Sequence, residues 1–253
     1  MLLVLTYHRI VERKESIAGF FDVTVEDLER HVALARRFWG KCLSPAEIAA
    51  ATDRPAEGTR PKVHGFAITF DDGSEDHYRT AAPVLERMGA KGIFFVSTAL
   101  IGVTGYVTAS QCCELESRGH AVESHAHDHV PLTSLSEVEL QRQLGESRRI
   151  LTELGLGRGR MIAPPGGYFD ARVMRSARAS GYDVLRTIEW GYNRRLDPLR
   201  CESIIINQQT GGRWCKTLIH PRGEVVKKAL YRVKEAVKRT RFRDLYFRLR
   251  QTC

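Results

Sequence analysis

The stretch ITFDDGSED, residues 68–76, decides the fold, because an apolar strand here runs into two adjacent aspartates and a glycine. The strand, residues 65–70, is apolar along nearly its whole length, which is typical of a parallel sheet covered on both faces. In parallel α/β folds the reactive side chains gather at the carboxyl ends of the strands. Asp71 and Asp72 stand at such an end, and neighbouring strand residues point to opposite sides, so the two carboxylates can serve different purposes.

Further short apolar segments along the chain are also predicted to be strands, with helical patterns between most of them. Thr24 and Ser136 stand at capping positions before two of the helical patterns. Alternating strands and helices predict a parallel sheet with helices outside it, either an open doubly wound sheet or a closed barrel. The other predicted strands are residues 2–8, 92–97, 120–124, 160–163, 183–187 and 203–207.

The length and composition suit a soluble α/β protein. With 253 residues, 43% of them apolar, the chain can bury the core of one large domain or two small ones. The six cysteines form no CxxC pair, so we expect reduced thiols rather than a disulfide framework or a zinc knuckle. The apolar N-terminus is shorter than a signal-peptide core and no segment has the length of a membrane span, so we expect a cytoplasmic protein.

The net charge of +9 is concentrated at the C-terminus. Residues 227–250 hold ten basic and two acidic side chains, which gives +8 and leaves the remaining chain close to neutral. We therefore expect no nucleic-acid partner. Residues 226–253 are predicted to form a basic amphipathic helical tail after a main domain of residues 1–225. The tail could lie peripherally on the inner membrane surface, or its apolar stripe could pack on the domain with the charges solvated.

The two aspartates have two interpretations. Adjacent carboxylates repel each other, and this raises the pKa of one of them unless a cation lies close by. A bound metal ion would remove the conflict. Alternatively, Asp71, Asp72 and Gly73 form a turn and cap the following helix.

A histidine cluster, ESHAHDHVPL (residues 123–132), favours the metal. His125 and His129 are four residues apart and would share one face of a helical turn, whereas His127 would point elsewhere. Together with Asp72 they would form a three-ligand site with open positions for water and substrate. The alternative is a solvated polar loop. The same ligand set also occurs in non-haem iron oxygenases, although those enzymes usually have β scaffolds.

Three stretches resemble motifs of the polysaccharide deacetylase family, also called the NodB-homology domain or carbohydrate esterase family 4. They are TFDDG (69–73), HAHDH (125–129) and APPGGYFD (163–170). The order and spacing match over residues 65–190. The resemblance implies a distorted (β/α) barrel of about seven parallel strands and a metal-dependent hydrolase that removes an N-acetyl or related acyl group from an amino sugar.

The resemblance also implies roles for individual residues. Asp71 would be the catalytic base, and Asp72, His125 and His129 would bind a divalent metal, most simply Zn²⁺, with Co²⁺, Ni²⁺ or Mn²⁺ as alternatives. The family's general acid is a histidine after a Leu-rich strand, for which we prefer His8 over His220, because permuted members of the family begin with this strand. The predicted substrate-binding residues are Pro165, Gly166, Tyr168 and Trp190.

The chain departs from the family pattern at three places. Ala126 stands where Ser or Thr is usual, Ala163 replaces the arginine that orients the base, and Glu189-Trp190 replaces Asp-Trp. The substrate would be a polysaccharide or a lipid-linked glycan. Because the groove arginine is missing from its motif, a catalytically inactive glycan-binding module is the alternative function.

Overall fold

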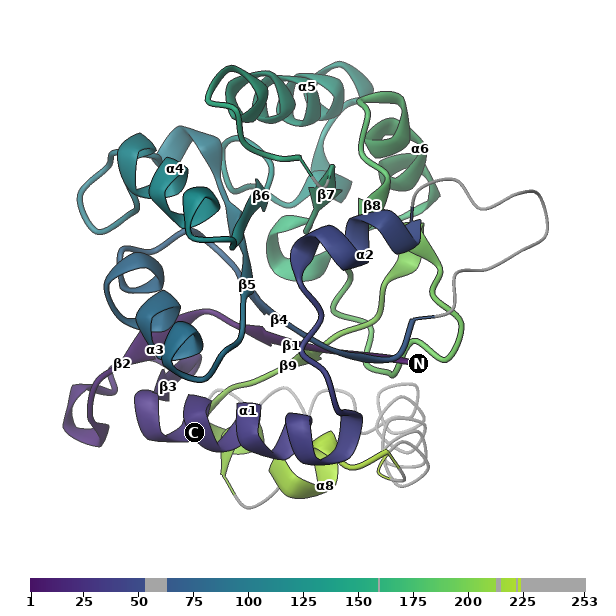
Figure 1. The fold of residues 1–253 in the computed structure, drawn as a ribbon. Helices are drawn as coiled ribbons and strands as arrows, with labels where there is room; N and C mark the ends of the chain where they lie inside the picture. The colour runs from purple at the N-terminus through teal and green to yellow at the C-terminus, as the bar shows by residue number, and fades with distance from the viewer. Residues whose placement is uncertain (53–62, 159, 213–214, 222, 224–253) are drawn as a thin grey trace, which may run out of the picture.

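The computed structural model describes residues 1–52, 63–158, 160–212, 215–221 and 223 (Figure 1). All seven strands predicted from the sequence are present and form one parallel sheet in the order β8-β7-β6-β5-β4-β1-β9. The predicted tail, residues 226–253, and the domain boundary at residue 225 lie outside the described residues. The seven strands are β1 (Leu2–Tyr7), β4 (Gly65–Phe70), β5 (Gly92–Val96), β6 (Ala121–Ser124), β7 (Met161–Ile162), β8 (Val184–Leu185) and β9 (Ile204–Ile205).

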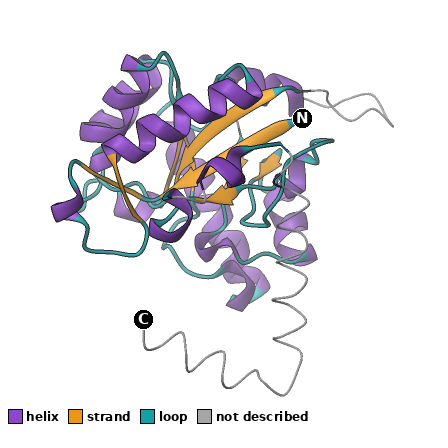
Figure 2. Cartoon of the chain, turned by 90° about the horizontal axis from the view of Figure 1, so that it is seen from below, coloured by secondary structure: helices purple, strands orange, loops and turns teal. Residues whose placement is uncertain are grey.

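The sheet curls into a distorted barrel, with strands inside and helices around them (Figures 1 and 2). Strands β8 and β9 are its two edges, and they do not pair with each other directly. Instead, Arg186, just after β8, bridges to Cys201 on the segment that leads to β9. The predicted α/β barrel is therefore confirmed, in a curled and incompletely hydrogen-bonded form.

Two of the helix starts follow from their caps. The Thr24 hydroxyl accepts a hydrogen bond from the Asp27 amide at the start of α1, and the Ser136 hydroxyl accepts one from the Glu139 amide at the start of α5. The α-helices are α1 (Val25–Trp39), α2 (Pro45–Thr52), α3 (Ala82–Arg87), α4 (Ala109–Ser117), α5 (Glu137–Glu153), α6 (Ala171–Ala179), α7 (Gln208–Gly211) and α8 (Cys215–Ile219). Helix α3 continues a π-helical turn, His77–Ala81.

A small second sheet was not predicted from the sequence. Strands β2 (Arg9–Val11) and β3 (Asp22–Thr24) pair in parallel directly after β1. Each has three residues, too short for a periodic pattern to show. The pairing returns the chain to the region of His8, since the ring of Phe21, the residue before β3, stacks on the His8 ring.

An aromatic row aligns the carboxyl ends of the central strands. Tyr7, Phe70 and Phe94 are fully buried, and their backbones are directly paired across β1, β4 and β5. Their rings stack with centroids 5.5 Å and 4.9 Å apart. Because Tyr7 and Phe70 end their strands at the same level, the residues that follow, His8 and Asp71, emerge side by side at one edge of the sheet.

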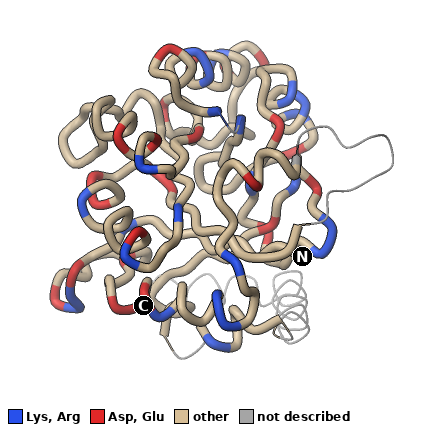
Figure 3. Tube along the Cα trace, in the orientation of Figure 1, with Lys and Arg blue, Asp and Glu red and all other residues tan. Residues whose placement is uncertain are grey.

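Basic and acidic residues are interspersed along the chain trace of the described part (Figure 3). The five cysteines within that part are free thiols, as predicted. Among the described residues, no helix has the length and apolar character needed to cross a bilayer.

Candidate metal and catalytic site

The site is assembled from residues that directly follow strands of the main sheet. His8 follows β1, Asp71 follows β4, His125 follows β6 and Arg186 follows β8. Parallel strands place their carboxyl ends at one edge of a sheet, so side chains far apart in sequence meet there.

The structure brings together the three predicted metal ligands. One ligand atom each from Asp72, His125 and His129 lies within 4.8 Å of the others. Oδ1 of Asp72 is 3.0 Å from Nε2 of His129 and 3.3 Å from Nε2 of His125. His125 is buried, whereas the side chains of Asp72 and His129 are 33% and 40% exposed, so one side of the cluster is open to solvent.

The donor set fits a divalent metal such as Zn²⁺. Two ligand atoms that are each about 2.0–2.1 Å from a tetrahedral ion are roughly 3.3 Å apart, close to both observed spacings. Nδ1 of His125 donates a hydrogen bond to the carbonyl oxygen of Ala163 at 2.7 Å. This bond leaves the lone pair of Nε2 to bind a metal. Three protein ligands with an open side are typical of a catalytic rather than a structural zinc site.

The histidine loop is not the helical turn that the i, i+4 spacing predicted. Residues 125–131 contain no helix, and Ala126 and His129 adopt left-handed backbone conformations with φ of 60° and 55°. These two left-handed residues, rather than helical periodicity, bring the side chains of His125 and His129 together. His127 does point elsewhere, with its Nδ1 2.9 Å from the Thr98 hydroxyl.

The Asp-Asp-Gly turn is also left-handed. Asp72 has φ of 80° and Gly73 has φ of 79°. A Cβ atom on Gly73 would come within 2.9 Å of Cγ1 of Val96, so only glycine fits. Non-glycine residues rarely adopt this conformation, and such strain concentrates at functional sites.

Asp71 has a basic partner, so the prediction that its partner is missing is wrong. Arg186 binds both carboxylate oxygens of Asp71 through Nη2. Both side chains are almost fully buried, at 3% and 5% exposure. The sequence did contain a signal, since an arginine at the end of an apolar strand, DVLRT (183–187), is seldom buried without a partner.

This arrangement keeps Asp71 ionised. Burial acts to raise the pKa of the Asp71 carboxyl, but Arg186, followed by His125 and His8, outweighs it, so the pKa lies below its ordinary value. For Asp72, burial is likewise outweighed, here by hydrogen bonds with His125 and His129, and the pKa is again lowered. Both carboxylates are therefore ionised near neutral pH, as their predicted roles of base and metal ligand require.

His8 belongs to the same cluster. Burial lowers its pKa, while the charges of Asp71 and Asp72 oppose that effect. Nδ1 of His8 is buried and has no hydrogen-bond partner among the described residues. The rejected alternative, His220, follows helix α8 rather than a strand, and its ring packs edge-to-face on Phe38 at 4.8 Å.

The predicted substrate residues occupy different environments. Pro165 and Gly166 lie in a short 3-10 helix, η5 (Pro165–Gly167), just after the Ala163 carbonyl that contacts His125. Tyr168 is 59% exposed beside them. Trp190 is half-buried and packs against the main core, with its ring 5.7 Å from that of Tyr192. A sugar-binding role for these residues stays a prediction.

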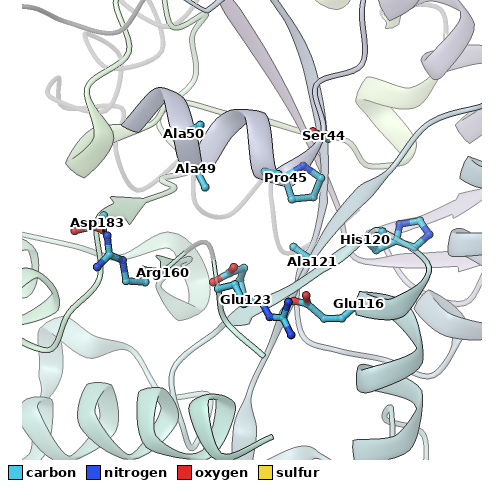
Figure 4. Close-up of a pocket in the computed structure, with 13 residues that line it drawn as sticks. Ser44, Pro45, Ala49, Ala50, Glu116, His120, Ala121, Glu123, Arg160 and Asp183 are labelled. Carbon is cyan, nitrogen blue, oxygen red and sulfur yellow. Dashed lines mark ion pairs between the residues drawn. The ribbon is translucent and has the colours of Figure 1, made fainter. Parts of the chain in front are cut away.

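A separate cavity of about 490 Å³ lies at the amino ends of the strands, whereas the candidate site lies at their carboxyl ends (Figure 4). It is lined by helix α2 and by residues at the amino ends of strands, among them Ala121, Arg160 and Asp183. The buried Glu123 in its wall accepts a hydrogen bond from the Met161 amide. None of the described residues lining it belongs to the candidate site, so the cavity and the ligand cluster are distinct.

Comparison with known proteins decides the family. A family model described as Polysaccharide deacetylase matches residues 58–185, half of the chain. The chain belongs to the polysaccharide deacetylase family. The matched range contains Asp71, Asp72, His125 and His129, whereas His8 and Arg186 lie outside it.

Curated relatives match parts of the chain. The Bacillus subtilis protein YxkH, which carries a provisional polysaccharide deacetylase name, is 27% identical over 75% of this chain and 65% of its own length. The Bacillus cereus peptidoglycan-N-acetylglucosamine deacetylase is 24% identical over 51% of this chain and 57% of its own length. The chain thus spans less than two thirds of either relative.

Solved structures support the fold. The Streptococcus pyogenes deacetylase PplD, solved in complex with acetate, has a TM-score of 0.73 and 22% identity, covering 87% of this chain and 98% of its own. IcaB from Ammonifex degensii has a TM-score of 0.71 and 22% identity, covering 85% and 95%. The match in both directions shows that the curled barrel extends well beyond the region matched by the family model.

Two departures from the family motifs have local explanations in this chain. Ala126 is fully buried and packs in a cluster with Leu132 and Ile162, so a methyl group fits where Ser or Thr is usual. Glu189 of the Glu-Trp pair binds the exposed Arg200, with Oε1 2.6 Å from Nη2.

Proposed function

We propose that this protein is a metal-dependent hydrolase that removes an N-acetyl group from an amino sugar of a polysaccharide or lipid-linked glycan. The single observation that carries the proposal is the position of an ionised, arginine-bound carboxylate, Asp71, next to the cluster of Asp72, His125 and His129. The name of the Bacillus cereus relative supports the substrate class, since that protein is a peptidoglycan-N-acetylglucosamine deacetylase.

In this proposal Asp72, His125 and His129 hold the metal. When bound, the ion supplies a water of lowered pKa and polarises the acyl carbonyl. Asp71 accepts a proton from the attacking water, because its carboxylate is charged and Arg186 fixes both oxygens. His8 donates a proton to the leaving amine nitrogen. The products are acetate and a free amino sugar.

The glycan-binding alternative rested on the loss of the groove arginine. Arg186 supplies the same charge to Asp71 from another strand end, so that reason no longer applies. An inactive module would also have no need to maintain a buried ion pair beside three metal-ligating groups.

The experiment is acetate release from a panel of N-acetylated sugars, with Zn²⁺, Co²⁺, Ni²⁺ or Mn²⁺ returned to chelated protein. Asp71→Asn is expected to keep the metal but lose about 10²–10⁴-fold in rate, the usual contribution of a general base. His125→Ala is expected to lose both metal and activity. The exposed His64 offers a control, His64→Ala, that should change neither. Wild-type protein that released no acetate with any metal would contradict the proposal.

We also propose peripheral contact with an anionic membrane surface through residues 227–250, on the strength of their charge. Flotation with anionic vesicles tests this proposal, with and without residues 227–253. Equal flotation of the two forms would contradict it.

A further inference from the structure

Two phenylalanines on one loop are exposed next to the candidate site. Phe20 is 44% exposed and Phe21 is 41% exposed. Their rings meet edge-to-face with centroids 5.1 Å apart. Covering these two rings with a ligand would remove apolar surface from water, which favours binding.

The pair is connected to the catalytic candidate His8. The ring of Phe21 stacks on the His8 imidazole at 4.5 Å, with an angle of 28° between the planes. His8 is the proposed proton donor to the leaving amine. With His8 in that role, Phe21 and its neighbour Phe20 would lie beside the sugar that loses its acetyl group.

The loop is fixed in place before any ligand binds. The buried Asp22 carboxylate accepts hydrogen bonds of 2.8 Å from the amides of Ala18 and Gly19. From the far end of the chain, the Gln208 amide donates to the Phe20 carbonyl, and the Gln208 side chain donates to the Gly19 carbonyl at 2.7 Å. A surface held in this way loses little conformational entropy on binding.

We propose that Phe20 and Phe21 form a subsite that binds the sugar ring next to the one being deacetylated. This inference rests on the proposed function. The apolar face of a pyranose ring can cover an exposed phenyl ring, and the adjoining unit of a glycan chain is what reaches a surface beside His8. A membrane is a poorer partner, because residues 9–26 carry three basic and four acidic side chains rather than a basic cluster.

The test measures kcat/KM for acetate release from the monomer and the tetramer of N-acetylglucosamine, with Phe20→Ala and Phe21→Ala. We expect the ratio of the tetramer value to the monomer value to fall about tenfold in each variant, through a higher KM for the tetramer. Val138, an exposed apolar residue on α5, gives the control Val138→Ala, which should leave the ratio unchanged. An unchanged ratio in the Phe20→Ala and Phe21→Ala variants would overturn the subsite.

A second measurement separates failure of the subsite from failure of the proposed function. Tetramer binding is measured by calorimetry in the Asp71→Asn background, where no turnover is needed. We expect Phe20→Ala to weaken it about tenfold, even if the wild type released no acetate from these sugars. If Phe20→Ala instead reduced flotation with anionic phospholipid vesicles and left tetramer binding unchanged, the subsite would be wrong and the loop would be a membrane contact.

Discussion

The lowered pKa of Asp71 depends mainly on one neighbouring side chain, that of Arg186. Burial alone would raise the pKa of the carboxyl, and Arg186 is the largest influence that lowers it. Because the lowered pKa belongs to the folded state, the base form of Asp71 persists as pH falls well below neutral.

Replacing Arg186 with methionine should therefore shift the acid limb of the pH–activity profile. Without the guanidinium, burial raises the pKa of Asp71, so the carboxylate is lost at a higher pH than in the wild type. We expect the acid limb of kcat/KM to move to higher pH, with lower maximal activity. The control is Arg200→Met, which removes the exposed pair with Glu189 and should leave the limb in place. An unshifted limb in Arg186→Met would contradict the assignment of Asp71 as base.

The buried ion pair of Asp71 and Arg186 also predicts how variants of the two residues change the free energy of unfolding. Removing one partner of a buried ion pair leaves an uncompensated charge and costs roughly 3–5 kcal/mol. Arg186→Met should lower the free energy of unfolding by about this amount. The double variant Asp71→Asn/Arg186→Met should be more stable than Arg186→Met alone, because no charge remains unpaired. Denaturant unfolding of Asp71→Asn, Arg186→Met and the double variant checks this, and additive losses would count against a coupled pair.

The sequence predicted Asp71 and marked Arg186 as an arginine that needs a partner, but it could not show that the two residues pair. Motif comparison looks for the arginine at position 163, where this chain has alanine. The charge comes instead from residue 186, which is 115 positions from Asp71 and adjacent only because β8 and β4 belong to one curled sheet. Partners defined by sheet geometry are not visible in local sequence.

At the level of elements, two loops with left-handed residues hold the proposed metal ligands. Asp72 and Gly73 form one loop after β4, and Ala126 and His129 shape the other after β6. Caps and apolar periodicity located the strands and the larger helices, but an i, i+4 pair of histidines fits a helix and a doubly reversed loop equally well. The prediction of a helical turn failed for that reason.

Gly73→Ala tests whether the loop after β4 must be left-handed and unobstructed. The added Cβ would meet Val96 at 2.9 Å, and the positive φ would cost about 1 kcal/mol more. We expect metal affinity to fall at least tenfold, because the turn that carries Asp72 must shift.

The control for this change is Gly181→Ala. Gly181 has a similar φ of +88°, but a Cβ there would have nothing within 4 Å. Gly181→Ala should lower the free energy of unfolding by a comparable amount, because of the positive φ, and should keep the wild-type metal affinity. Metal titration of both variants separates backbone strain from displacement of the ligand. If both variants bound metal equally well, the contact with Val96 would be unimportant to the site.

For the whole molecule, the metal would tie together loops from β4 and β6, which are 57 residues apart in the chain at Asp72 and His129. A ligand that binds only the folded state at 100 times its Kd stabilises that state by about 2.7 kcal/mol. For a domain of this size, such a change corresponds to a rise in Tm of roughly 5–10 °C. Chelation should therefore lower the Tm of the metal-loaded protein by that amount.

The change in Tm on chelation should also depend on pH, and the protonation of His129 determines the direction. The hydrogen bond to Asp72 raises the pKa of His129 above its ordinary value, so without metal this pair stabilises the fold below pH 6.5, and the contribution is lost as pH rises through the raised pKa. Metal binding requires neutral imidazole and must displace the proton at low pH. The Tm difference between Zn²⁺-loaded and chelated protein should accordingly be larger at pH 8 than at pH 5.5. His129→Ala should abolish the difference at both pH values, whereas His127→Ala, two residues away and turned toward Thr98, should retain it. A Tm difference that did not change with pH would mean that His129 is not a ligand.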